Sequence, residues 1–136
     1  MSFLRTIYLI FDTDRQEHMN KFEEIINGNY PSTIINKFTG LNEPLVSLHN
    51  QMIMAPEYIF IEDHFMTDMS YSILRKICRL EKVGETHIII FGRSVDELDR
   101  AKAKNCKVSF LRIDDYNSLD LQQIKESLKQ NFSRSI

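Results

Sequence analysis

The sequence is poor in glycine and has almost no excess of either charge, and each shortage excludes a class of protein. The four glycines stand at positions 28, 40, 84 and 92, too scattered to build the glycine-rich loop that holds the phosphates of a nucleotide. The formal net charge of −2 gives no electrostatic reason to expect binding to nucleic acid or to an anionic membrane. No apolar run approaches the roughly 20 residues that a membrane-spanning helix needs. We therefore expect neither nucleic acid nor a membrane as a partner.

Cysteine is also scarce. Cys78 and Cys106 lie inside otherwise regular segments, which favours two buried thiols in a reducing compartment over a disulfide. The N-terminal stretch MSFLRTIYLIF lacks the cleavage-site pattern of a signal peptide and is typical of a first strand. Together these features predict a cytoplasmic protein.

Apolar runs and helical periodicity alternate five times along the chain. Runs typical of buried strands occupy residues 4–11, 32–38, 57–61, 86–91 and 108–111. Apolar residues at helical spacing follow over residues 15–26, 40–54, 68–80, 94–104 and 118–132. This alternation predicts one α/β domain over residues 1–136, with a parallel sheet, right-handed crossovers and helices on both faces.

Short polar signals mark the ends of the expected helices. Asn27-Gly28-Asn29 is typical of a helix end, and Asp68 is suited to cap the third helix. Ser94 with Glu97 three residues later forms a capping box for the fourth.

Charged residues gather where the expected strands end. In open parallel sheets, sites lie at the carboxyl ends of the strands. The residues at those ends are Asp12, Asp14, Glu62, Asp63, Phe91, Gly92 and Arg112. This edge of the sheet is the candidate site.

Two segments around that edge carry a family resemblance. PEYIFI, residues 56–61, looks like a Pro-Asp-hydrophobic strand entry, and SILRKI, residues 72–77, looks like the helix that follows. With five strand–helix units, they make the chain resemble the receiver domain of two-component response regulators over nearly its whole length. The resemblance implies a doubly wound, flavodoxin-like sheet of five strands in the order 2-1-3-4-5. Both segments place Glu62, without gaps, at the family's phospho-accepting Asp.

The resemblance also implies roles for the other residues of the edge. In the family, acids bind Mg²⁺, a Thr or Ser at the end of strand four binds the phosphoryl oxygens, and a Lys ends strand five. The family's acidic pair falls at Asp12 and Thr13, so a hydroxyl replaces one metal-binding acid. Asp14 follows, and Asp12 with Asp14 would form a weak Mg²⁺ site. Phe91 and Gly92 stand at the hydroxyl position and the small residue after it, and Arg112 stands at the Lys position.

These departures predict a degenerate receiver. Glu62 is one methylene longer than Asp, and catalytic geometry is unforgiving on a scale of roughly 1 Å. Phe91 removes the hydroxyl. The planar fork of Arg112 suits a carboxylate, so we hypothesise a permanent ion pair between Glu62 and Arg112. A one-residue slip would make Asp63 the acceptor instead, although successive strand residues point to opposite faces.

The sequence therefore predicts a stand-alone receiver-like domain, not an enzyme, that works in two-component signalling through protein–protein contact. A histidine kinase, a phosphotransfer protein or a downstream protein is the expected partner, and a homodimer would use the fourth helix, fifth strand and fifth helix. Three alternatives stay open. One is a phosphorylatable receiver that uses Asp63 or Glu62 with Mg²⁺ on Asp12 and Asp14. The second is a flavodoxin-like domain that binds a small molecule at the same edge. The third is that these acids are ordinary surface residues at strand ends.

Overall fold

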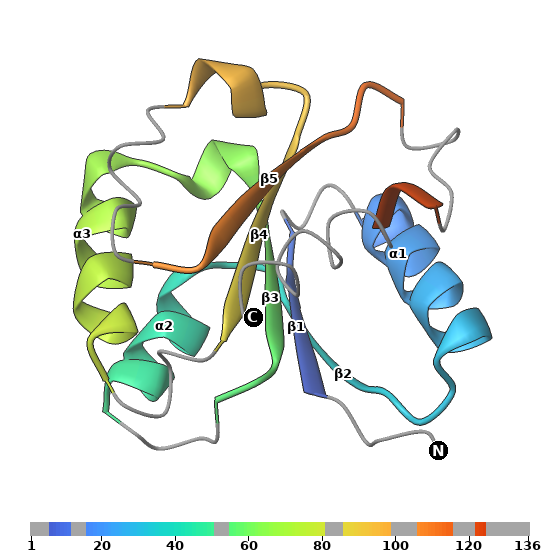
Figure 1. Cartoon of the computed structure of the whole chain (residues 1–136), viewed down its shortest axis with the longest axis horizontal. Helices are drawn as coiled ribbons and strands as arrows, with labels where there is room; N and C mark the ends of the chain where they lie inside the picture. The colour runs from blue at the N-terminus through green and yellow to red at the C-terminus, as the bar shows by residue number, and fades with distance from the viewer. Residues whose placement is uncertain are drawn as a thin grey trace.

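Five parallel strands form one sheet in the order β2-β1-β3-β4-β5 (Figure 1). The structure is a computed structural model, and it describes residues 6–11, 16–50, 55–80, 86–98, 106–115 and 122–124. The strands are β1 (Thr6–Ile10), β2 (Ile34–Phe38), β3 (Tyr58–Glu62), β4 (His87–Gly92) and β5 (Val108–Arg112). Each neighbouring pair runs parallel. The predicted doubly wound, flavodoxin-like sheet is confirmed.

Helices cover both faces of this sheet. The helical elements are α1 (Gln16–Asn29), α2 (Asn42–His49), α3 (Asp68–Cys78) and the 3₁₀ turns η2 (Asp63–Phe65) and η3 (Val95–Glu97). Figure 1 shows α2 and α3 side by side on one face and α1 on the other, next to the short helical piece at residues 122–124. None of the helices in the described ranges is long and apolar enough to cross a bilayer.

Alternate residues of each central strand enter two separate cores. In β3, Ile59 and Ile61 join the core beneath α2 and α3, which we call the α2–α3 core. Tyr58 and Phe60 join the core beneath α1, which we call the α1 core. Because both faces of the sheet are covered, the strands have continuous apolar sequences instead of an alternating pattern.

Four phenylalanine rings fill the α1 core near the carboxyl ends of the strands. Phe11, Phe22, Phe60 and Phe91 are all fully buried. The ring centroids of Phe11 and Phe91 lie 4.8 Å apart, and those of Phe22 and Phe91 lie 5.0 Å apart. These separations are typical of favourable aromatic pairs. We call this group the phenylalanine cluster.

The predicted end of the first helix is confirmed, because α1 ends at Asn29, within the Asn27-Gly28-Asn29 stretch. The predicted cap of the third helix is wrong. The cap of α3 is Thr67, whose hydroxyl accepts a hydrogen bond from the amide of Ser70 at 3.2 Å, and Asp68 is the first helical residue.

The predicted helix over residues 94–104 is present only as the 3₁₀ turn η3 in the described part of this segment. The side chain of Ser94 makes no capping hydrogen bond, and Leu98 is already extended, with φ −77° and ψ 145°. The capping box is therefore not formed. The backbone amide of Ser94 binds a different partner, described below. Residues 99–105 lie outside the described ranges, as does most of the predicted last helix.

The two cysteines are joined in a disulfide, so the prediction of two free thiols is wrong. The Cα atoms of Cys78 and Cys106 lie 5.6 Å apart, within the usual range for a disulfide. The two residues are 28 positions apart, so no local pattern in the sequence links them. The fold brings the end of α3 and the start of β5 together.

Candidate functional site

The candidate site lies where β3, β4 and β5 end. The sheet register pairs Glu62 of β3 with Phe91 of β4, and Gly92 of β4 with Arg112 of β5. Four of the residues predicted from the sequence are thus on one edge, and Asp63 follows directly as the first residue of η2. Asp12 and Asp14 lie outside the described residues.

Glu62 is a buried carboxylate with an exposed fraction of 2%. By the alternation of β3, its side chain follows Tyr58 and Phe60 onto the α1 face. Phe91, its register partner, lies on the same face and is fully buried. The Oε1 atom of Glu62 lies 3.5 Å from Nδ1 of His64, a side chain with an exposed fraction of 38%. Because its carboxylate is enclosed by protein, Glu62 is poorly placed to accept an incoming group from solvent.

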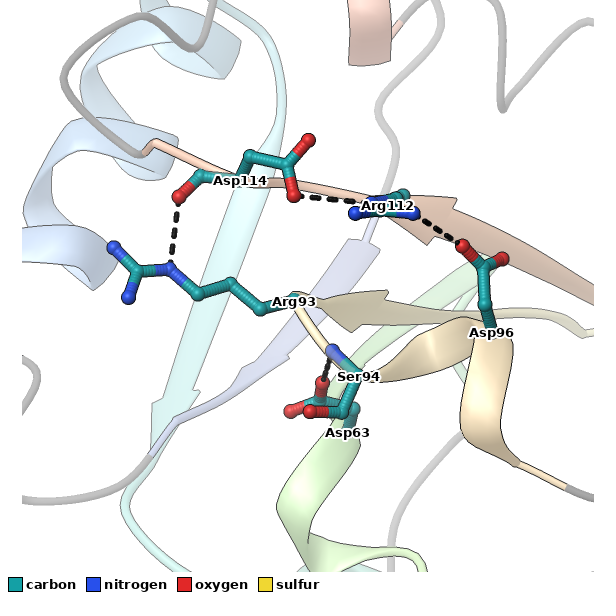
Figure 2. Close-up of polar contacts among 6 residues, drawn as sticks. All are labelled: Asp63, Arg93, Ser94, Asp96, Arg112 and Asp114. Atoms are coloured by element: carbon teal, nitrogen blue, oxygen red, sulfur yellow. Dashed lines mark hydrogen bonds and ion pairs between the residues drawn. The ribbon is translucent and has the colours of Figure 1, made fainter.

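Asp63 has a different environment, shown in Figure 2. Its Oδ2 atom accepts a hydrogen bond from the backbone amide of Ser94 at 2.6 Å. The residue is partly exposed, in contrast to Glu62. This hydrogen bond connects η2, after β3, to the loop after β4. The Asp63 carboxylate therefore faces the β4–η3 loop.

Gly92 makes that contact between the two loops sterically feasible. A Cβ atom at position 92 would overlap all three terminal atoms of the Asp63 carboxyl group. The φ angle of Gly92 is +141°, a conformation that L side chains rarely adopt. Both the space and the backbone at this position thus require glycine.

Phe91 belongs to the core. Its ring packs in the phenylalanine cluster, with centroid distances of 4.8 Å to Phe11 and 5.0 Å to Phe22. A phenyl ring offers no donor for a phosphoryl oxygen. The residue at the predicted hydroxyl position therefore contributes packing in place of hydrogen bonding.

Arg112 does not pair with Glu62, so the predicted ion pair is wrong. Its Nη1 atom lies 2.8 Å from Asp96 of η3 and its Nε atom 3.0 Å from Asp114 (Figure 2). The hydrogen bonds to Asp114 and Asp96 raise the pKa of Arg112 above its ordinary value. The Arg112 side chain is 57% exposed, because β5 is an edge strand and its last side chain extends into solvent. Glu62, by contrast, is buried.

Arg93 completes the polar network of Figure 2. Its Nε atom donates a hydrogen bond to the backbone carbonyl of Asp114 at 2.8 Å. The loop after β4 is thus connected to the loop after β5 through Arg93, and to η2 through Ser94. The three loops at this edge form one hydrogen-bonded unit.

Metal binding at the edge depends on residues outside the described ranges. Where side chains are described, no group of three His, Cys, Asp or Glu residues is arranged to hold an ion. Mg²⁺ is bound by carboxylates, carbonyls and water. Glu62 and Asp63 alone do not fit such a site, because Glu62 is buried and one Asp63 oxygen already accepts a hydrogen bond. A site would need Asp12 and Asp14.

An apolar pocket in the described part of the chain lies away from this edge, so it gives no support to small-molecule binding at the candidate site. That apolar pocket is lined by Ile7, Ile26, Tyr30, Thr33, Tyr58, Phe60 and Ile124. Tyr58 is the first residue of β3 and Ile7 the second of β1. The pocket therefore opens towards the amino ends of the strands, opposite the candidate site.

Sequence reasoning missed the partners that organise the edge. The sequence predicts a helix cap at Ser94, whereas its backbone amide binds Asp63. Asp96 and Asp114 had no assigned role, yet they hold Arg112. The charges of these residues are visible in the sequence. Their pairing depends on how β4 and β5 end side by side, which no local pattern encodes.

Comparison with known proteins shows which solved structures share this fold. No protein-family model matches the chain, and no curated protein matches it. Solved structures do. A response regulator receiver domain (CheY-like) from Methylobacillus flagellatus aligns with a TM-score of 0.65 and 11% identity over 95% of this chain and 99% of that one. The chemotaxis response regulator CheY4 of Vibrio cholerae aligns with a TM-score of 0.62 and 12% identity over 95% and 99%.

A third solved structure, the phosphorylated cyanobacterial phytochrome response regulator RcpA, aligns with a TM-score of 0.65 and 13% identity over 98% of this chain and 97% of that one. The alignments extend over nearly the full length of all three proteins. Sequence identities of 11–13% support a conclusion about the fold only. The chain therefore has the fold of the CheY-like response regulator receiver domains.

Proposed function

We propose that the chain is a receiver-like signalling domain that acts by protein–protein contact, without enzymatic activity and without efficient phosphotransfer at Glu62. The observation that carries this proposal is the burial of Glu62, which is 2% exposed beside the fully buried Phe91. A phosphoryl group on Glu62 would have to enter the α1 core. Moving a dianionic group from water into an apolar core carries a large desolvation cost.

The state of Arg112 supports the same proposal. A cation that neutralises a phosphoryl group must be able to reach it. Here the Nη1 and Nε atoms of Arg112 are held by Asp96 and Asp114. The hydrogen-bonded loops at the edge therefore favour one conformation in the absence of phosphate. Partners of the expected kind, a histidine kinase, a phosphotransfer protein or a downstream protein, would bind that conformation. The cytoplasmic location remains a prediction.

A second candidate function has its own observation. Asp63 is partly exposed, faces the loop after β4 and contacts Gly92 and Ser94. Phosphorylation of Asp63, with Mg²⁺ on Asp12 and Asp14, would make the chain an active receiver. Its Oδ1 atom would be the nucleophile, because Oδ2 accepts the Ser94 amide hydrogen bond.

Intact mass spectrometry after incubation with acetyl phosphate and Mg²⁺ tests both candidates, with beryllofluoride binding followed by fluorine NMR in parallel. The primary proposal expects no gain in mass and no bound beryllofluoride signal. A gain of one phosphoryl group that Asp63→Asn abolishes, while Glu62→Gln retains it, would establish the second candidate. A gain abolished only by Glu62→Gln would overturn the argument from burial.

A further inference from the structure

The disulfide joins two elements that lie far apart in the sequence. Cys78 is the last residue of α3, and Cys106 comes two residues before β5. The 28-residue separation encloses the whole of β4. Strand β5 is at the edge of the sheet, next to β4. The bond is therefore a covalent connection between a helix on one face and the start of an edge strand.

Neither cysteine is fully enclosed in the core. They are half-buried and pack against the α2–α3 core from its margin. Exchange requires that a thiolate approach one of the two sulfur atoms, so partly exposed disulfides react and fully enclosed ones resist. Each cysteine is followed in the sequence by a cation, Arg79 or Lys107. Nearby cations favour the thiolate form of a released cysteine.

The fold has other interactions that hold β5 when the bond is open. The amide of Ile88 donates a hydrogen bond to the carbonyl of Lys107 at 2.8 Å, directly beside Cys106. Val108 is buried in the α2–α3 core. At the other end of the strand, the amide of Ile113 donates a hydrogen bond to the carbonyl of Gly92 at 3.1 Å. Because pairing and packing remain, both the oxidised and the reduced chain are expected to fold.

We propose that Cys78 and Cys106 form a reversible thiol–disulfide switch, opened and closed by exchange with a low-molecular-weight thiol such as glutathione. A glutathione thiolate attacks one sulfur and forms a mixed disulfide, which releases the other cysteine as a thiolate that takes up a proton. A second glutathione thiolate then attacks the glutathione sulfur of the mixed disulfide, and the remaining cysteine leaves as a thiolate that takes up a proton. Two electrons pass to the protein, leaving two cysteine thiols and one glutathione disulfide. Glutathione disulfide closes the bond by the reverse steps.

The switch regulates the mobility of the amino end of β5. It does not depend on phosphorylation of Asp63 or Glu62. In the closed form, the amino end of β5 is fixed to the carboxyl end of α3. In the open form, that end of β5 is held by strand pairing and packing alone. Where the glutathione pool is mostly reduced, the dithiol is the resting form. Oxidation then reduces the mobility of the amino end of β5.

The first test measures the equilibrium. The folded full-length chain is incubated in glutathione buffers of increasing oxidised-to-reduced ratio, its thiols are trapped by alkylation, and the products are counted by intact mass. The switch predicts a graded change from two alkylated cysteines to none while the chain stays folded. Two results would overturn it: a bond that is reduced only when the chain is unfolded, or two thiols that stay free even in the most oxidising buffer.

The second test measures the structural consequence by hydrogen exchange of the oxidised and reduced wild-type chain. Amides at the end of α3 and the start of β5 should exchange at least roughly tenfold faster after reduction, because a loop of this size restrains opening by more than that factor. Strand β2, the opposite edge of the sheet, is the internal control and should not change. A variant carrying both Cys78→Ser and Cys106→Ser should have the exchange rates of the reduced chain. Glutathione should not change those rates. Equal exchange at β5 in both forms would refute the switch.

Discussion

The carboxyl group of Asp63 occupies the space in which a side chain at Gly92 would begin. A Cβ atom at position 92 would overlap its Cγ, Oδ1 and Oδ2 atoms, and the same carboxyl group accepts the amide hydrogen bond of Ser94. This contact places the loop after β3 directly on the loop after β4. It gives the candidate site a defined shape without any ligand.

Gly92→Ala should therefore destabilise the chain. A non-glycine residue at φ +141° costs about 1–3 kcal/mol, and the overlap with Asp63 adds to that cost. The free energy of unfolding in urea measures the loss. Gly28→Ala is the matched control, because a Cβ there meets nothing within 4 Å, and in helix α1 it should stabilise by up to about 1 kcal/mol. Equal stabilities of the two variants would contradict the contact.

The overlap can be separated from the backbone strain by a double-mutant cycle. In an Asp63→Ala background, the overlap with the carboxyl group is removed and only the strain of the positive φ angle remains. Gly92→Ala should then cost less than in the wild-type chain, with a coupling of about 0.5–3 kcal/mol. The same urea experiment on four proteins gives this value. Strict additivity would show that the two residues do not meet.

Phe91→Thr should be strongly destabilising, even though it restores a hydroxyl at the position where the resemblance expects one. The ring of Phe91 is fully buried in the phenylalanine cluster. Removing a buried phenyl ring costs roughly 3–5 kcal/mol, and the new hydroxyl would need a partner there. Phe91→Leu, which keeps most of the volume, should cost clearly less. Unfolding midpoints that rank Thr at or above Leu would place the ring outside the core.

The ion pairs of Arg112 should contribute little to stability. They lie in solvent, with side-chain exposed fractions of 57% for Arg112, 52% for Asp96 and 72% for Asp114, and exposed pairs are weak and screened by salt. Arg112→Gln should leave the unfolding midpoint nearly unchanged, and any difference should vanish in high salt. A large loss that persists in salt would mean that Arg112 has a structural role beyond these pairs.

Burial raises the pKa of Tyr8 above its ordinary value, which is about 10. Above that pH the unfolded chain loses the phenolic proton while the folded chain keeps it. Unfolding then releases a proton, so the free energy of unfolding should fall as the pH rises from about 10 towards the folded pKa. Tyr8→Phe should flatten this part of the profile. Identical slopes for both proteins in urea titrations across that pH range would contradict the shift.

The sheet was predictable because its signals are local and strong. Runs such as His87–Phe91 combine β-branched and aromatic residues without charge, and the cover on both faces explains why they do not alternate. The parallel direction follows from the strand–helix alternation. The position of Glu62 and Arg112 at one edge follows from the same topology. These parts of the fold needed no knowledge of tertiary contacts.

The contacts within the site were not predictable, because each depends on side-chain direction. Glu62 and Arg112 end strands in the same sheet, but one side chain enters the α1 core and the other extends from an edge strand into solvent. Ser94 matched a helix cap, yet its amide binds Asp63 and the described turn ends by Leu98. The disulfide of Cys78 likewise depends on the packing of α3 beside β5.

The disulfide has a topological consequence for any machine that unfolds the chain from one end. When the bond is closed, pulling extends the polypeptide only as far as the cysteine pair, and β4 stays within a covalent ring. A processive unfoldase would have to thread two polypeptide segments through its pore at once. A protease that cuts inside the ring would leave both pieces attached. The oxidised chain should therefore outlast the reduced one under processive degradation, whatever their difference in equilibrium stability.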